Sequence, residues 1–274
     1  MVAHQPDVTL RSRAERPTVA PIRLRRALEY ARRYHRLSVN LRHQHLVLPD
    51  SRARAADPAN HTHFLINFPG SPSGVDELTA WLPMLHRLSR WAPVAILVGD
   101  VLAYRAVSAE TALPCYFGRV ASEAEYVAQQ LQTKVMLYVN QSKLNLREAG
   151  FHDILHVFLG APGPGRQNWL NNRLRLYDYV LAPDDESKAW LAARMMAYDV
   201  STTVRIVGRP VPPAGPLSGL GARLRAADVA EAGVDVDAVV EELLQIRDER
   251  DRLVTERDAR LAEQGIVLLK GGQA

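Results

Sequence analysis

The stretch from Val135 to Val180 reads VMLYVNQSKLNLREAGFHDILHVFLGAPGPGRQNWLNNRLRLYDYV and decides the expected fold. It contains two short apolar runs, Val135–Val139 and Ile154–Leu159, which are bounded by polar loops. The second run opens into a loop rich in glycine and proline, Gly160–Gly165. Open α/β sheets place their ligands where a strand leads into such a loop before a helix. We therefore expect any ligand site at the ends of these strands.

Five further apolar runs lie before this stretch, at its end and after it, and they alternate with helical patterns. Strands are predicted at Phe64–Phe68, Val94–Val98, Leu113–Phe117, Tyr177–Leu181 and Val204–Val207. All these runs are continuously apolar rather than alternating, which favours a parallel sheet covered on both faces. The predicted fold class is α/β, with a single Rossmann-like domain and a mainly parallel sheet over residues 60–212.

The helices between these strands are predicted from their spacing. Residues 75–91 carry apolar residues three and four apart, which indicates an amphipathic helix with a kink at Pro83. Shorter helices are expected at residues 108–111, 122–131, 142–149 and 184–198, and Ser122 is the predicted N-cap of the second of these.

Positive charge is concentrated at the N-terminus. Residues 1–54 hold twelve arginines, no lysine and four acidic residues, for a formal charge of +8, so the rest of the chain carries −4 of the total of +4. A helix is predicted from Ile22, with Leu24, Leu28, Ala31 and Leu37 forming an apolar stripe. The arginines expected to bind a polyanion or partner are Arg23, Arg25, Arg26, Arg32, Arg33 and Arg36.

Such a basic helix can lie on anionic lipid, nucleic acid or an acidic protein surface, so residues 11–54 are expected to contact an anionic partner. The alternative is a solvated arm, or a packing helix with a charged outer face. We assign residues 1–59 to this arm and helix, and interpret residues 50–60 as a linker to the main domain.

Beyond residue 212 the composition changes. Residues 213–234 form a linker rich in proline and glycine, and residues 235–274 form a charged helical tail. Within the tail, a helix over 235–263 has an apolar seam of Val239, Leu243, Ile246 and Leu253. The seam predicts docking on a protein partner or pairing with a second copy, and the alternative is a solvated surface helix.

Composition limits the remaining possibilities. Cys115 is the only cysteine, which excludes an intrachain disulfide and a cysteine-based metal site. Neither a signal peptide nor a transmembrane segment is expected, and cytoplasmic residence fits best. His43, His45, His61 and His63 are close in sequence but lack a pattern of partnering carboxylates, so we expect neither a metal nor another cofactor.

Five short segments, in order, carry a resemblance to a known family. They are WLPMLHRL (Trp81–Leu88), VMLYVNQSKLN (Val135–Asn145), HVFLG (His156–Gly160), NNRLRLYDYV (Asn171–Val180) and VGRP (Val207–Pro210). Over residues 64–212 the chain resembles the N-terminal half of actinobacterial CDP-glycerol glycerophosphotransferase-like proteins, which are GT-B transferases of teichoic-acid and wall-polymer synthesis. The resemblance implies the acceptor-side Rossmann half of a GT-B fold.

The chain departs from this family where the family carries its chemistry. After the strand, the family has an HG-x-S-D-K loop whose histidine is taken as the catalytic base. Here the histidine position is Ala161, the serine and aspartate positions are Pro164 and Gly165, and only Arg166 keeps the cationic charge of the lysine. About sixty residues follow VGRP, too few for a second Rossmann domain, so we expect the donor-binding domain to be absent.

Two groups of residues remain as candidates for a site. His156 is the only substitute for the lost base, and the alternative is a histidine satisfied within the sheet. The candidates for ligand binding are Asn140, Lys143, Asn145, Gly160, Arg166 and Asn172. For the asparagines and the lysine that follow the first strand, the alternative is a role in capping the next helix.

These observations favour a non-catalytic, transferase-derived binding or assembly module that oligomerises or docks on partners through its basic arm and C-terminal helix. The alternative is a CDP-glycerol glycerophosphotransferase-like or glycosyltransferase-like subunit in teichoic-acid synthesis, which would need a separate donor-binding domain.

Overall fold

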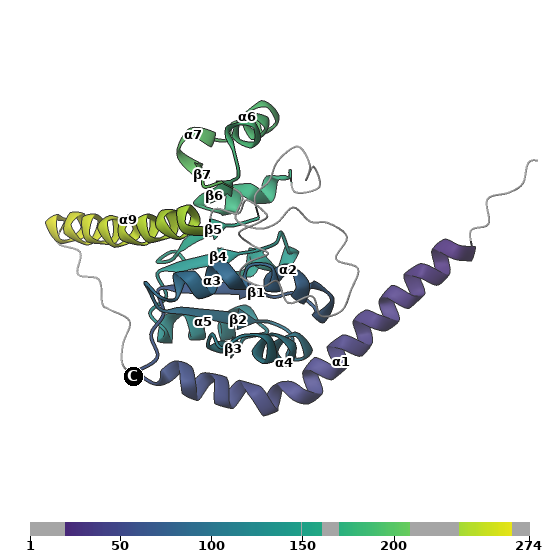
Figure 1. Cartoon of the computed structure of the whole chain (residues 1–274). Helices are drawn as coiled ribbons and strands as arrows, with labels where there is room; N and C mark the ends of the chain where they lie inside the picture. Colours follow the sequence, from purple (N-terminus) through teal and green to yellow (C-terminus); the bar gives the residue numbers. More distant parts are fainter. Residues whose placement is uncertain (1–19, 149, 161–169, 209–235, 265–274) are drawn as a thin grey trace, which may run out of the picture. The chain divides into compact units, whose positions relative to one another are not determined.

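The protein is described by a computed structural model over residues 20–148, 150–160, 170–208 and 236–264 (Figure 1). The chain divides into two compact units between Arg42 and His43. The first unit contains the N-terminal part of helix α1 (Ala20–Ala56). The second unit contains the last turns of α1 and every other described element, so it begins earlier in the chain than the expected boundary at residue 60.

The second unit is built on a seven-stranded sheet in which every neighbouring pair is parallel. The strand order is β3-β2-β1-β4-β5-β6-β7. The strands are β1 (Phe64–Phe68), β2 (Val94–Val98), β3 (Cys115–Phe117), β4 (Val135–Tyr138), β5 (Leu155–Phe158), β6 (Tyr179–Ala182) and β7 (Val204–Ile206). All seven lie within predicted runs or overlap them closely, and the predicted α/β fold with a Rossmann-like domain is confirmed.

Helices cover both faces of this sheet. The α-helices are α2 (Val75–Thr79), α3 (Leu82–Leu88), α4 (Val101–Glu110), α5 (Ala121–Gln130), α6 (Asp185–Arg194), α7 (Val200–Thr203) and α9 (Val236–Glu263). Residues of α2, α3, α4 and α9 share one apolar core, and residues of α5, α6 and α7 share the other. Among the described helices, none has the length and apolarity that a membrane crossing requires.

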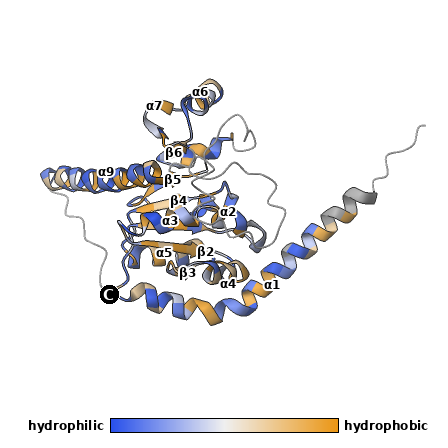
Figure 2. Ribbon diagram, viewed as in Figure 1, coloured by the Kyte–Doolittle hydropathy of each residue, from blue (hydrophilic) through white to orange (hydrophobic). Residues whose placement is uncertain are grey.

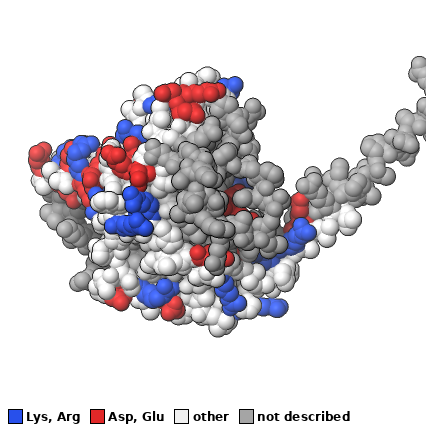
Figure 3. Space-filling view, viewed as in Figure 1, with Lys and Arg blue, Asp and Glu red and all other residues white. Residues whose placement is uncertain are grey.

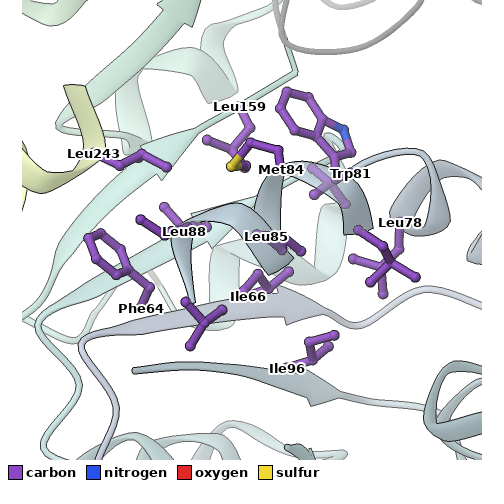
Figure 4. Close-up of a cluster of buried hydrophobic side chains, with 14 of the residues drawn as sticks. Phe64, Ile66, Leu78, Trp81, Met84, Leu85, Leu88, Ile96, Leu159 and Leu243 are labelled. Atoms are coloured by element: carbon purple, nitrogen blue, oxygen red, sulfur yellow. The ribbon is translucent and has the colours of Figure 1, made fainter. Parts of the chain in front are cut away.

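The first core is centred on α3 and β1. Figure 4 shows Met84, Leu85 and Leu88 of α3 packed over Phe64 and Ile66 of β1. Each of these side chains is at most 1% exposed. Because both faces of the sheet are covered in this way, the strands are apolar on both sides, as is typical of buried parallel sheets.

The helix predicted over residues 75–91 is instead two helices. α2 ends at Thr79, and α3 begins at Leu82 with Pro83 in its first turn. Proline lacks an N–H group and its ring collides with the carbonyl four residues earlier, so it is favoured in a first turn and disfavoured inside a helix. The prediction of a single kinked helix is therefore wrong.

Two predicted helix starts also change. The helix expected at residues 108–111 begins at Val101, where the Asp100 carboxylate accepts hydrogen bonds from Leu102 N (3.0 Å) and Ala103 N (3.1 Å). Ser122 does not cap α5. Instead, the Glu123 carboxylate reaches back to the backbone N–H groups of the two residues before the helix, at 2.8 and 3.1 Å.

The stretch predicted to be a linker continues α1 as helix to Ala56 and covers the edge strand β3. Ser51 Oγ accepts a hydrogen bond from Phe117 N (2.7 Å), and Arg54 Nη2 donates to Cys115 O (2.9 Å). Two helical side chains thus satisfy backbone groups that a neighbouring strand would otherwise pair. The linker prediction for residues 50–56 is wrong because docking on this edge keeps them helical.

The predicted C-terminal helix is present as α9, but its apolar seam packs on the chain's own sheet. Val239, Leu243 and Ile246 are buried in the core beside α3 and β4, and Figure 4 shows Leu243 in the same cluster as Leu88. Farther along, Leu253 is 38% exposed. The first three seam residues are therefore unavailable for the partner docking or self-pairing that the sequence suggested.

The outer side of α9 is charged. Figure 3 shows acidic and basic side chains interspersed over this helix. Its acids also reach the sheet, because Arg205 of β7 lies 3.6 Å from Glu242 and 3.5 Å from Glu249. Partly exposed pairs of this kind contribute little individually, so burial of the seam is what holds the helix.

Leu243→Ala is therefore expected to lower the free energy of unfolding by about 2–5 kcal/mol, because it opens a cavity in the core. Leu253→Ala serves as the matched control on the same helix and should cost well under about 1 kcal/mol. Urea unfolding followed by circular dichroism measures both. Equal and small losses would contradict the packing of α9 on the sheet.

Candidate functional site

The strand order reverses between β1 and β4, so the crevice at the carboxyl ends of these strands is where a ligand site is expected. We call the segments that follow the two strands, Pro69–Gly74 and Val139–Glu148, the carboxyl edge. Directly after β1 the chain forms a three-residue 3₁₀ helix and then the five-residue α2. Neither is the glycine-rich turn and long helix that bind a dinucleotide pyrophosphate.

The segment after β4 is held by its own asparagines. Asn140 Nδ2 donates to Glu77 Oε2 (2.9 Å), and Asn145 Nδ2 donates to Asn140 O (2.7 Å) and to Tyr177 Oη (3.1 Å). Ser142 caps a 3₁₀ helix, Lys143–Arg147, where an α-helix over 142–149 was predicted. These bonds tie the loop after β4 to α2 and to Tyr177, two residues before β6.

Three polar side chains of this region are buried with hydrogen-bonding capacity left over. Asn67, Asn145 and Glu148, which we call the polar cluster, are each at most 3% exposed. Within the described part of the chain, Asn145 Oδ1 lacks a hydrogen bond, and the Asn67 amide and the Glu148 carboxyl group interact with each other without reaching full hydrogen-bond geometry. Such groups are rare in folded proteins, and each one calls for an explanation.

The charge of Glu148 is governed mainly by burial. Desolvation raises the pKa of its carboxyl group, and the nearby Arg147 guanidinium and Asn67 amide only partly offset the rise. Arg147 Nη2 lies 3.4 Å from Glu148 Oε1, but the same side chain also donates to Arg119 O and Leu144 O. Glu148 is therefore a buried carboxyl group without a dedicated cation.

His156 lies on β5 near this region, and both of its ring nitrogens have partners within the protein. Tyr138 Oη lies 2.8 Å from its Nδ1, and its Nε2 lies 3.2 Å from Phe151 O. Burial lowers the pKa of the ring, which favours the neutral form, with Nε2–H donating to the carbonyl and Nδ1 accepting from the tyrosine. Both nitrogens are engaged inside the protein, so we do not retain His156 as a candidate base.

The other predicted ligand residues are dispersed. Lys143 and Asn172 are exposed, Gly160 is buried at the end of β5, and Asn140 lies at the rim through its bond to Glu77. Arg166, like Ala161, Pro164 and Gly165, lies outside the described residues. Of the six candidates, the structure brings Asn140 and Asn145 together and places only Asn145 in the polar cluster.

The arginines of the N-terminal arm belong to the first unit. Arg32 is exposed and Arg36 is half-buried, both on α1. The backbone of Arg23, Arg25, Arg26 and Arg33 is helical, and their side chains lie outside the described part. In the described ranges, no group of three or more His, Cys, Asp or Glu residues is placed to hold a metal ion.

The sequence analysis missed Asn67, Glu148 and Tyr177. Asn67 carried a signal, because it is the one polar residue in the buried strand FLINF. A polar side chain inside such a strand needs a buried partner. Glu148 gave no comparable signal, since it lies in a polar segment predicted to be helical, where an exposed carboxylate is ordinary.

A cavity of about 400 Å³ lies at the opposite, amino-terminal edge of the sheet, between α5, the start of β4 and α9. Its charged lining residues already have protein partners. Lys134 pairs with Asp251, and Arg250 donates to Asp153 O at 2.9 Å. We therefore favour the carboxyl edge as the candidate site.

Comparison of the chain with protein families, with curated proteins and with solved structures gives no match. The fold class therefore rests on the strand order and the parallel pairing described above.

The raised pKa of Glu148 predicts a pH-dependent stability. A buried carboxyl group whose pKa is higher in the folded state stabilises the fold at low pH, and this contribution is lost as pH rises through the folded-state value. We expect Glu148→Gln to gain stability relative to the wild type as pH rises above the ordinary range of a carboxyl group, until Glu148 of the folded wild type is ionised. Thermal unfolding as a function of pH, with the exposed Glu125→Gln as control, measures the difference. A difference that does not change with pH would refute the assignment.

Proposed function

We propose that this chain is a non-catalytic, transferase-like binding module that holds a hydroxyl-rich ligand, a polyol or sugar, at the carboxyl edge. The polar cluster carries the proposal. Leaving a buried donor or acceptor unpaired costs about 1–3 kcal/mol, and three residues whose polar atoms are unpaired or only weakly paired lie together at the point where this fold places ligands. A ligand that supplies the missing hydrogen bonds recovers that cost.

The chemistry of the cluster favours hydroxyl groups over phosphate. It offers an amide donor on Asn67, an amide acceptor on Asn145 and a carboxyl group on Glu148. A hydroxyl group both donates and accepts, so neighbouring hydroxyls of a polyol can pair with all three. A phosphate would face the carboxylates of Glu148 and Glu77. The resemblance to transferases of wall polymers points to the same ligand class.

Several observations support binding without catalysis. The position of the family's catalytic histidine is Ala161, and both ring nitrogens of His156 are engaged by the fold. A general base has to reach the proton that it removes, and the described carboxyl edge offers no free imidazole. The single buried cysteine, Cys115, fits a reducing compartment, and we place the module in the cytoplasm.

Isothermal titration calorimetry of the full chain against glycerol, ribitol, sorbitol and common hexoses tests ligand binding. We expect saturable binding of at least one of them, and a loss of about tenfold or more in Asn67→Leu, which removes a hydrogen-bond donor (about 1.4 kcal/mol per tenfold). Asn172→Ala changes an exposed asparagine and should bind as the wild type does.

Two outcomes would contradict the proposal. The absence of saturable binding across the panel would contradict the proposed ligand site. Turnover of CDP-glycerol by the purified chain would contradict the non-catalytic assignment.

The second candidate function is a glycerophosphotransferase-like subunit that works with a separate donor-binding chain. The raised pKa of Glu148 favours it, because buried carboxyl groups with raised pKa values are typical of general acids and bases. In that case Glu148→Gln would abolish transfer by the assembled enzyme while leaving ligand binding within a few fold.

A further inference from the structure

The N-terminal part of α1 exposes a continuous apolar side. Leucines and tyrosines along it are between 42% and 75% exposed: Leu24, Leu28, Tyr30, Tyr34, Leu37 and Leu41. Figure 2 shows apolar and hydrophilic bands alternating along this helix. Exposed apolar side chains gathered on one side of a helix indicate a surface that binds another apolar phase.

The opposite side of the same helix is basic. At about 100° per residue, these six residues fall within roughly half of the helix circumference. Five of the seven arginines fall on the other half, whereas Arg23 and Arg42 fall on the apolar half; the five are Arg25, Arg26, Arg32, Arg33 and Arg36. Residues 20–42 contain seven arginines and a single acidic residue, Glu29, so the segment carries a formal charge of +6.

This combination selects among the possible occupants of the surface. A second copy of the helix would bring two segments of charge +6 together with only one acidic residue, Glu29, on each to face seven arginines, which opposes a coiled coil. A nucleic acid would neutralise the arginines but leave the leucines and tyrosines in water. A bilayer with anionic headgroups satisfies both sides at once.

We propose that residues 20–42 bind the surface of an anionic lipid bilayer as an interfacial helix. The leucines enter the boundary between headgroups and acyl chains, and Tyr30 and Tyr34 lie at the headgroup level, where tyrosine is enriched. The arginines contact lipid phosphates. The inference does not depend on ligand binding at the carboxyl edge, and adds a membrane surface as a partner of the chain.

Vesicle flotation of the full-length protein tests this inference. Vesicles of phosphatidylcholine alone are compared with vesicles that contain 30% phosphatidylglycerol. We expect binding to the anionic vesicles, at least about tenfold weaker binding to the neutral ones, and weakening as salt is raised. Equal binding to both compositions, or to neither, would overturn the proposal.

Paired variants separate a bilayer from other occupants. Leu24→Gln with Leu28→Gln removes apolar area without changing charge, and Arg32→Gln with Arg36→Gln removes charge. Each pair should weaken binding to anionic vesicles about tenfold or more, whereas Leu102→Gln, an exposed leucine of α4, should leave it unchanged. These residues are exposed or half-buried on the surface, so circular dichroism should show unchanged folding.

Three further outcomes would overturn the proposal. The leucine pair could leave vesicle binding intact while the arginine pair abolishes it, which would indicate a purely electrostatic contact. Binding of a 20-base-pair DNA duplex more tightly than anionic vesicles would indicate a nucleic acid. Dimers that dissociate in the leucine variant, as measured by light scattering, would indicate a second copy.

Discussion

A parallel sheet has to be covered on both faces and protected along its edges, and the rest of this structure depends on that constraint. Both ends of the described chain serve it. The last turns of α1 satisfy backbone groups of the edge strand β3 through Ser51 and Arg54. The helix α9 places Leu243 and its neighbours over the opposite half of the sheet. Two segments whose charged sequences suggest appendages are therefore parts of the domain.

The candidate site is formed where the loop after β4 packs against the covered sheet. The asparagines of the loop after β4 tie it to α2 and to Tyr177, and this arrangement encloses Glu148 beside Asn67. Enclosure excludes water from groups that would otherwise be fully hydrated, so any hydrogen bond that these groups do not make within the protein is a cost to the fold. Tyr138 and His156 are buried next to this region. Their polar side-chain atoms are hydrogen-bonded to each other and to Phe151 O. The residues proposed to bind a ligand thus lie next to residues whose hydrogen bonds hold the fold together.

Elements that depend on neighbouring residues in the chain were predicted well, whereas features that depend on distant residues were not. Strands were found because a buried parallel strand is a contiguous apolar run, as in FLINF and VAILV. Helix limits were less accurate, because Pro83 begins a helix where spacing alone indicated continuity. At the carboxyl edge, Asn140 and Asn145 were named as ligand candidates from their position after a strand, whereas Glu148 was not, because a glutamate in a polar segment is ordinarily exposed.

The sequence by itself determined the α/β class, the strands and the charged helices at both ends. Each of these depends on residues that are close together in the chain. Only the tertiary structure decided that α9 turns its seam inward, that residues 50–56 protect an edge strand, and that Asn67 lies beside Glu148. Burial and pairing join residues far apart in sequence, such as Ser51 with Phe117 and Leu243 with Leu88, and local periodicity carries no information about such partners.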